Sequence, residues 1–136
     1  MTPTGNASGL LGTFTGLVIK DEQTMIVSRS EDVPLRTTDG GMTWLPMPSC
    51  APVATFGHGL VWSWSGKTLV MMGSGGSRST ADHPHAPFVW VSKDDGDSWT
   101  DETGDLVTMA PGAANWYEGD FYINSMGQGI QVKSFE

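Results

Sequence analysis

The chain has few cysteines, which form the disulfides of small secreted proteins, and few basic residues, which bind nucleic acids. Its single cysteine, Cys50, excludes an internal disulfide, and we expect a buried, unreactive thiol. Seven Lys and Arg against 15 Asp and Glu give a net charge of −8, and the basic residues are scattered along the sequence. Nucleic acids and anionic membranes are bound through concentrated basic faces, so neither is an expected partner.

Long apolar runs are also missing. No stretch approaches the roughly 18 residues of a membrane-spanning helix. The N-terminus from Met1 to Asn6 has neither the cationic start nor the apolar segment of a signal peptide. If the protein acts outside a cell, we expect it to get there without its own signal peptide, as a virion component or a fragment would. Gly, Pro or polar residues interrupt every helix-length window, so the sequence predicts short strands joined by tight turns.

What the sequence does contain is one eight-residue pattern in two copies. Residues 37–44 read TTDGGMTW and residues 92–99 read SKDDGDSW, so both fit S/T-x-D-x-G-x-S/T-W. The Asp can accept hydrogen bonds from backbone N–H groups one or two residues on, and the Gly can supply a positive φ. Turn chemistry explains this spacing without catalysis or calcium binding. We therefore assign a structural role to Thr37, Asp39, Gly41, Thr43, Trp44, Ser92, Asp94, Gly96, Ser98 and Trp99.

The repetition extends beyond these octapeptides. Residues 13–18 resemble residues 55–61, and the apolar run 88–91 enters the second octapeptide as 33–36 enters the first. The spacing between the copies is larger at the octapeptides than at the start of the repeats, so the second copy carries an insertion within Gly73 to Ala86. Repeats of about 40 to 50 residues built from short strands are typical of propeller blades.

On these motifs the chain resembles the Asp-box, or BNR-repeat, β-propeller family, with blades similar to those of sialidases, sortilin-type receptors and phage tail or virion proteins. In that family the box forms the turn between the third and fourth strands of a blade. The resemblance implies one all-β domain over 1–136. Its four-stranded blades would span about 10–48 and 52–103, with a partial third blade over about 110–136. There Ser134 would take the first box position and Glu136 that of the Asp.

Roughly two and two-thirds blades do not close a propeller of four to eight. Either the chain self-associates, with Met1 to Leu11 as a candidate for the missing outer strand, or it belongs to a larger propeller. A two-fold dimer would give about six blades and a trimer about eight or nine. We favour a homo-oligomer.

Two groups of residues are candidates for binding. The inserted loop carries Arg78, Asp82, His83 and His85, which we interpret as partner-contacting. Because Pro84 holds the two histidines apart and no further ligand is visible, we predict no metal site, and no cofactor motif is present. Trp116 and Tyr117 are the second group, expected to form a surface platform. The alternating Trp62 and Trp64 are expected in the core.

The sequence does not favour an enzyme. The arginines Arg29, Arg36 and Arg78 lack the arginine motif of sialidases, and neither Tyr117 nor Tyr122 has an evident Glu partner beyond Glu118. We expect a non-catalytic binding or assembly module that self-associates and presents loops to a glycan or protein, as an accessory or receptor-binding component of a phage or virus particle. The alternative is a fragment of a larger Asp-box glycoside hydrolase whose active site lies elsewhere.

Overall fold

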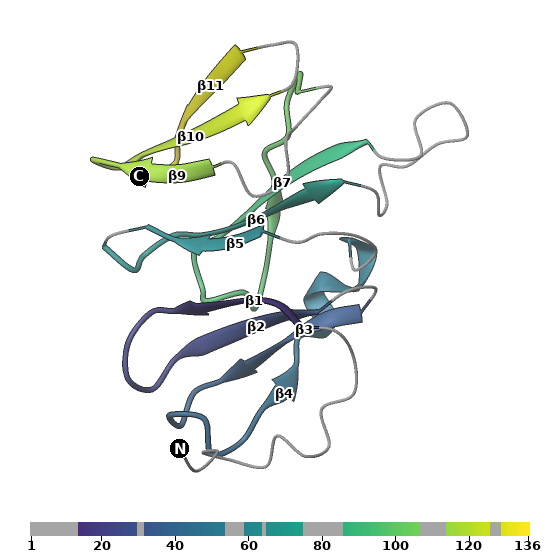
Figure 1. The fold of residues 1–136 in the computed structure, drawn as a ribbon, viewed down its shortest axis with the longest axis vertical. Coiled ribbons are helices and arrows are strands. Elements are labelled where there is room, and N and C mark those ends of the chain that lie inside the picture. Colours follow the sequence, from purple (N-terminus) through teal and green to yellow (C-terminus); the bar gives the residue numbers. More distant parts are fainter. Residues whose placement is uncertain are drawn as a thin grey trace.

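The computed structural model describes residues 14–29, 32–53, 59–63, 65–74, 86–106, 114–125 and 129–136. Within them the protein is all-β, with three antiparallel sheets and one short 3-10 helix, η2 (Pro48–Val53) (Figure 1). The first sheet has the order β1 (Phe14–Ile19), β2 (Met25–Arg29), β3 (Asp32–Thr37), β4 (Leu45–Pro46). The second has the order β5 (Gly59–Trp62), β6 (Leu69–Ser74), β7 (Pro87–Ser92), β8 (Thr100–Asp101). The third has the order β11 (Gly129–Ser134), β10 (Asp120–Ser125), β9 (Ala114–Tyr117).

The expected all-β chain of short strands joined by turns is confirmed. The segment after β4 is helical up to Val53, which ends η2; residues 54–58 lie outside the described part of the chain. Pro48 and Pro52 favour this helix over a strand, since proline cannot donate to a sheet ladder. The strand that follows the first octapeptide, β4, begins at Leu45.

The second sheet is apolar on both faces, so it lies between the other two sheets in a stack of three. Leu69 and Met71 of β6 point toward the first sheet, while Val70 and Met72 point toward the third. Alternation along the strand separates the two pairs. The first core layer adds Ile26, Met47, Cys50, Trp62 and Phe88. The second adds Val89, Val91, Leu106, Trp116, Phe121 and Ile123.

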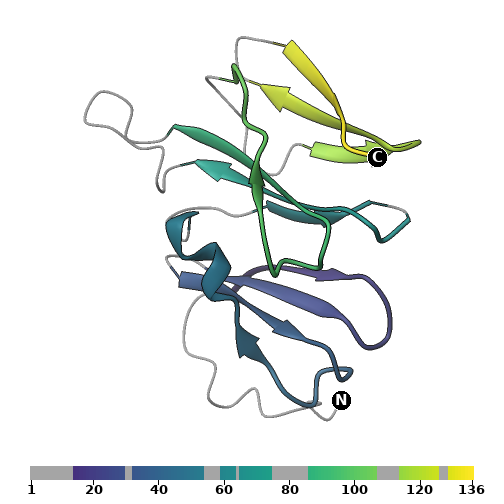
Figure 2. The same ribbon diagram turned by 180° about the vertical axis from the view of Figure 1, so that it is seen from behind.

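All three sheets are stacked in the same orientation. The loop that joins the first two strands of each sheet lies on one side of the stack (Figure 1), and the view from behind agrees (Figure 2). In the third sheet this loop is a two-residue turn with positive φ at Glu118 (49°) and Gly119 (88°). Two such residues give the turn whose twist matches antiparallel strands. Successive sheets therefore present opposite faces to one another.

Substitution in the second core layer should be costly. Phe121 is fully buried against Trp116, with ring centroids 5.1 Å apart. We expect Phe121→Ala to lower the free energy of unfolding by about 3–5 kcal/mol, because it removes apolar contacts and leaves a cavity. Leu45→Ala, at an exposed position, should cost less than about 0.5 kcal/mol. Denaturant unfolding of both variants measures the difference, and equal losses would contradict this core assignment.

Candidate functional site

The first octapeptide folds into a turn organised by one carboxylate. Asp39 Oδ1 accepts hydrogen bonds from the hydroxyl of Thr37 (2.8 Å) and the backbone N–H of Thr43 (2.9 Å). Its Oδ2 accepts from the Thr43 hydroxyl (2.6 Å). Gly41 N–H in turn donates to the Thr37 hydroxyl (2.9 Å). The donating N–H lies four residues after the Asp, so our expectation of a donor one or two residues on was wrong.

The second octapeptide repeats this turn atom for atom. Asp94 Oδ1 accepts from the hydroxyl of Ser92 (2.7 Å) and the backbone N–H of Ser98 (2.8 Å), and its Oδ2 accepts from the Ser98 hydroxyl (2.5 Å). Gly96 N–H donates to the Ser92 hydroxyl (2.8 Å). The φ angles of Gly41 and Gly96 are both 92°, which confirms the expected positive values.

Both carboxylates are held ionised. Hydrogen bonds from Thr43, the hydroxyl first, lower the pKa of Asp39 to about 2. The Ser98 hydroxyl and then its N–H lower the pKa of Asp94. A carboxylate whose oxygens already accept three hydrogen bonds is a poor general acid at neutral pH. The turns are suited to holding backbone in place, not to proton transfer.

The second turn also clamps two sheets together. The Lys20 ammonium group lies 2.8 Å from both carboxylate oxygens of Asp95. Arg36 donates to the backbone carbonyl of Asp95 (2.7 Å) and to the carboxylate of Asp97 (2.7 Å). From η2, the Ser49 hydroxyl donates to the carbonyl of Gly96 (2.7 Å). The first sheet and η2 thus contact three successive residues of this turn.

The sequence reasoning missed Lys20, Arg36 and Ser49. A weak signal was available in the second octapeptide, which carries the acids Asp95 and Asp97 where the first has Gly40 and Met42. That comparison does not identify Lys20 and Arg36 as the partners, because each repeat carries three basic residues. Ser49 lies in the segment whose 3-10 geometry was not foreseen.

The C-terminal segment does not form a third turn of this kind. Glu136 Oε1 accepts from the hydroxyls of Ser63 (2.6 Å), Ser65 (2.7 Å) and Thr68 (2.9 Å), which belong to the loop between β5 and β6. These bonds, that of Ser63 first, lower the pKa of Glu136. Glu136 therefore ties the third sheet to the second.

Ser134 likewise does not occupy the first position of a turn. Its hydroxyl donates to Asp120 (2.5 Å) at the surface, whereas Thr37 and Ser92 are buried. The expectation that Ser134 and Glu136 continue the repeated pattern was wrong, because Ser134 points to the opposite face of its sheet from the one that packs on β6. Sequence spacing could not reveal this one-residue shift.

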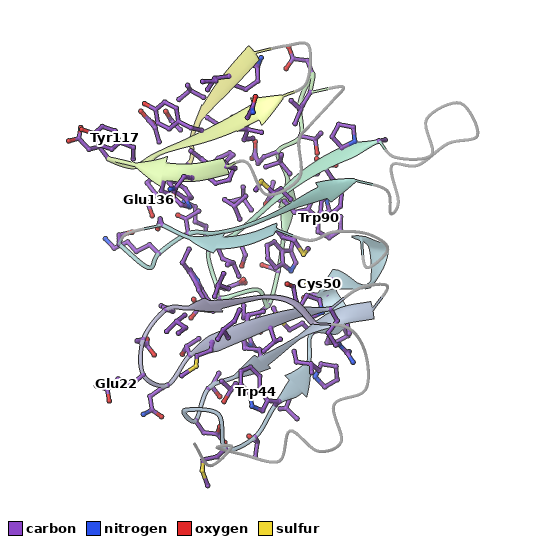
Figure 3. The ribbon with its side chains drawn as sticks, in the orientation of Figure 1. Glu22, Trp44, Cys50, Trp90, Tyr117 and Glu136 are labelled. Carbon is purple, nitrogen blue, oxygen red and sulfur yellow. The ribbon has the colours of Figure 1, made fainter. Side chains whose placement is uncertain are left out.

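The predicted aromatic platform is half wrong. Trp116 is only 2% exposed and lies in the second core layer against Phe121 and Phe135. Tyr117, the next residue on β9, is exposed and lies beside the hairpin loop (Figure 3). Trp62 is buried, as expected, while Trp64 lies outside the described residues. Trp44 and Trp99 are half-buried directly before β4 and β8.

The loop candidates Arg78, Asp82, His83 and His85 lie outside the described residues. In the part that is described, no group of three or more His, Cys, Asp or Glu side chains is placed to hold a metal ion. Burial raises the pKa of the Cys50 thiol to about 11, which suppresses the reactive thiolate. No helix among the described residues has the length and apolarity to cross a bilayer.

Two hollows lie beside loops that join neighbouring strands within the sheets. One, of about 480 Å³, is bordered by Lys20, Asp21, Trp62 and Ser65. The other, of about 500 Å³, is bordered by Ser65, Lys67, Lys93 and Glu136. Each has one side-chain carboxylate among its described lining residues, and each of these carboxylates already accepts hydrogen bonds from other residues of the protein. Glycoside hydrolysis requires two carboxylates across the bond to be cleaved, which neither hollow provides among those residues.

Comparison of the chain with protein-family models, curated proteins and solved structures found no match. The geometry of the chain itself is therefore the basis for the function proposed below.

The Asp94 carboxylate should stabilise the fold in a pH-dependent way. Asp94→Asn should lower the free energy of unfolding by about 1–2 kcal/mol at pH 7, a modest loss because the group is exposed. The lowered pKa means that the stabilisation is present above about pH 4 and is lost as the pH falls through the folded-state value. Unfolding measured from pH 7 to pH 2 should show the two proteins converging. A constant difference would contradict the role of the ionised carboxylate.

Gly96 should tolerate a side chain less well than Gly129. A Cβ at Gly96 would overlap Cε of Met47, and the φ of 92° disfavours any other residue. Gly129 has a similar φ of 75° but no atom within 4 Å of an added Cβ. Gly129→Ala should cost about 1–2 kcal/mol from backbone strain alone. Gly96→Ala should cost about 1 kcal/mol more, because the flexible end of the Met47 side chain must move aside, and thermal or denaturant unfolding measures the difference. Equal costs would show that the turn does not press on Met47.

Proposed function

We propose that this chain is a non-catalytic assembly and recognition module of the Asp-box β-propeller type. In this proposal the three sheets are successive blades, and copies of the chain associate to complete the array. The assembled scaffold presents loops to a glycan or protein partner, as an accessory or receptor-binding component of a phage or virus particle.

The observation that carries the proposal is apolar exposure at both ends of the stack. The outer face of the first sheet exposes Leu17 and Ile19, and the outer face of the third sheet exposes Tyr122, Ile130 and Val132. Apolar sheet faces are normally covered by another layer, and contiguous exposed apolar residues mark interaction surfaces. The two ends of the stack therefore favour association with further sheets.

The carboxylates favour a scaffold over an enzyme. Asp39 and Asp94 hold turns, Asp95 and Asp97 pair with cations of the first sheet, and Glu136 ties the third sheet to the second. These groups already have structural partners, and catalysis would need carboxylates aimed at a shared substrate position.

The molecular mass in solution tests this proposal. One chain has a mass of 14.5 kDa, and we expect light scattering at micromolar concentration to give about 29 kDa or a higher multiple. The mass should fall toward that of one chain on dilution, because association depends on concentration. A monomer at all accessible concentrations would overturn the assembly role and favour a piece of a larger propeller.

A further inference from the structure

The strand-pairing registers show which residues occupy equivalent positions in the three sheets. Beside the first hairpin loop of every sheet lies a ladder of three paired residues. These ladders are Ile19, Met25 and Thr37; Trp62, Leu69 and Ser92; and Trp116, Phe121 and Lys133. Trp62 and Leu69 point toward the first sheet, as Trp116 and Phe121 point toward the second. The ladders therefore mark the same face of each sheet.

The outer face of the first sheet is thus equivalent to the face of the second sheet that is buried against the first sheet. Ile19 occupies the position of Trp62, yet Ile19 is 59% exposed while Trp62 is 7% exposed. Met25 and Val27, which are half-buried, correspond by the same register to Leu69 and Met71 of the first core layer, and Leu35 on the same face is buried. The first sheet carries apolar residues where the second sheet is covered.

The outer face of the third sheet is the counterpart of the opposite buried face. By the same register Tyr122, Val132 and Ile130 occupy the positions of Val70, Val91 and Val89. Ile130 is 70% exposed, whereas Val89 is fully buried. A hollow of about 240 Å³ on this face is bordered by Asn115, Tyr122, Asn124 and Ile130, with Ala114 at its edge.

The charged contacts between the first two sheets have uncharged counterparts on both outer faces. Within the molecule, Arg36 of the first sheet pairs with Asp97 of the second turn. In the third sheet Val132 takes the position of Arg36, and in the first turn Met42 takes the position of Asp97. Both of these are exposed apolar residues.

The second ion pair follows the same rule. Tyr117 takes the position of Lys20 in the third sheet, and Gly40 takes the position of Asp95 in the first turn. In a contact of this geometry, replacement of one partner alone would leave an unpaired, partly exposed charge. Replacement of both partners keeps the two outer faces compatible with each other.

We propose that a second copy of this chain docks head to tail, with the outer face of its first sheet on the outer face of the third sheet. The contact repeats the packing of the second sheet on the first, and it places Met42 of one copy against Val132 of the other. This inference rests on the self-association in the proposed function. A second copy is the occupant because the two outer faces are complementary. At the positions where the internal contact has its two ion pairs, both outer faces carry uncharged residues.

The contact is heterologous, so its repetition either closes a ring or builds an open filament. Two copies would bring six sheets together, within the range of about four to eight blades found in propellers. A dimer closed by two identical contacts is the expected assembly.

Two single substitutions test the arrangement. Ile19→Asp places a carboxylate on the outer face of the first sheet, and Val132→Asp places one on that of the third. Each should weaken self-association of the full chain by at least about a hundredfold, because burial of an unpaired charge opposes the contact. Leu45→Asp is the matched control: Leu45 is exposed but pairs with Arg36, on the other face of the first sheet. It should associate as the original chain does.

Mixing the two variants gives the decisive measurement. Each retains one intact face, and the two intact faces are complementary, so a 1:1 mixture should form a heterodimer by analytical ultracentrifugation. Recovery of this dimer also shows that both variants fold. If the original chain associates but only one variant is impaired, like faces meet and the head-to-tail contact is wrong. If both are impaired and the mixture stays monomeric, the pairing of these faces is also wrong. A monomeric original chain would overturn the proposed function together with this inference.

Discussion

Burial of both faces of the middle sheet is the constraint on which the rest of the structure depends. A strand of alternating residues has one polar and one apolar face when a single layer covers it. In β6 both alternating sets are apolar, Leu69 and Met71 on one side and Val70 and Met72 on the other. Such a strand is stable in water only between two layers. The stack of three sheets follows from this requirement.

Polar contacts at one rim fix how the layers are aligned. Apolar packing is non-directional, so it leaves two stacked sheets free to slide or rotate by small amounts. The ion pairs of Lys20 and Arg36 with the second turn, and the hydrogen bonds of Glu136 to the loop between β5 and β6, act at defined points. The turn that holds Asp94 therefore serves two purposes. It connects β7 to β8, and it presents Asp95 and Asp97 to the neighbouring sheet.

This arrangement links the fold to the proposed assembly. An array in which every sheet offers one face to the sheet before it and another to the sheet after it has two unlike ends. The apolar residues on those ends, such as Ile19 and Val132, are the same kind of residue that fills the internal layers. Function in this proposal is a continuation of the packing that already holds the chain together.

Much of this organisation was readable from the sequence because it depends on local chemistry. The short strands, the turns and the positive φ of Gly41 and Gly96 follow from residues a few positions apart. Trp116 shows the limit: adjacent residues of a strand face opposite sides, so either Trp116 or Tyr117 could have faced solvent. The partner ladder at Phe121 decided which one. The same one-residue question of register misplaced Ser134.

The sequence by itself determined an all-β chain with two carboxylate-centred turns, since hydrogen bonds within eight residues and alternation within a strand need no distant partner. Only the tertiary structure decided which face of each sheet is covered, which cations meet Asp95 and Asp97, and where Glu136 binds. These features arise between segments far apart in the chain, and their geometry is fixed by the stacking of whole sheets, which no local pattern encodes.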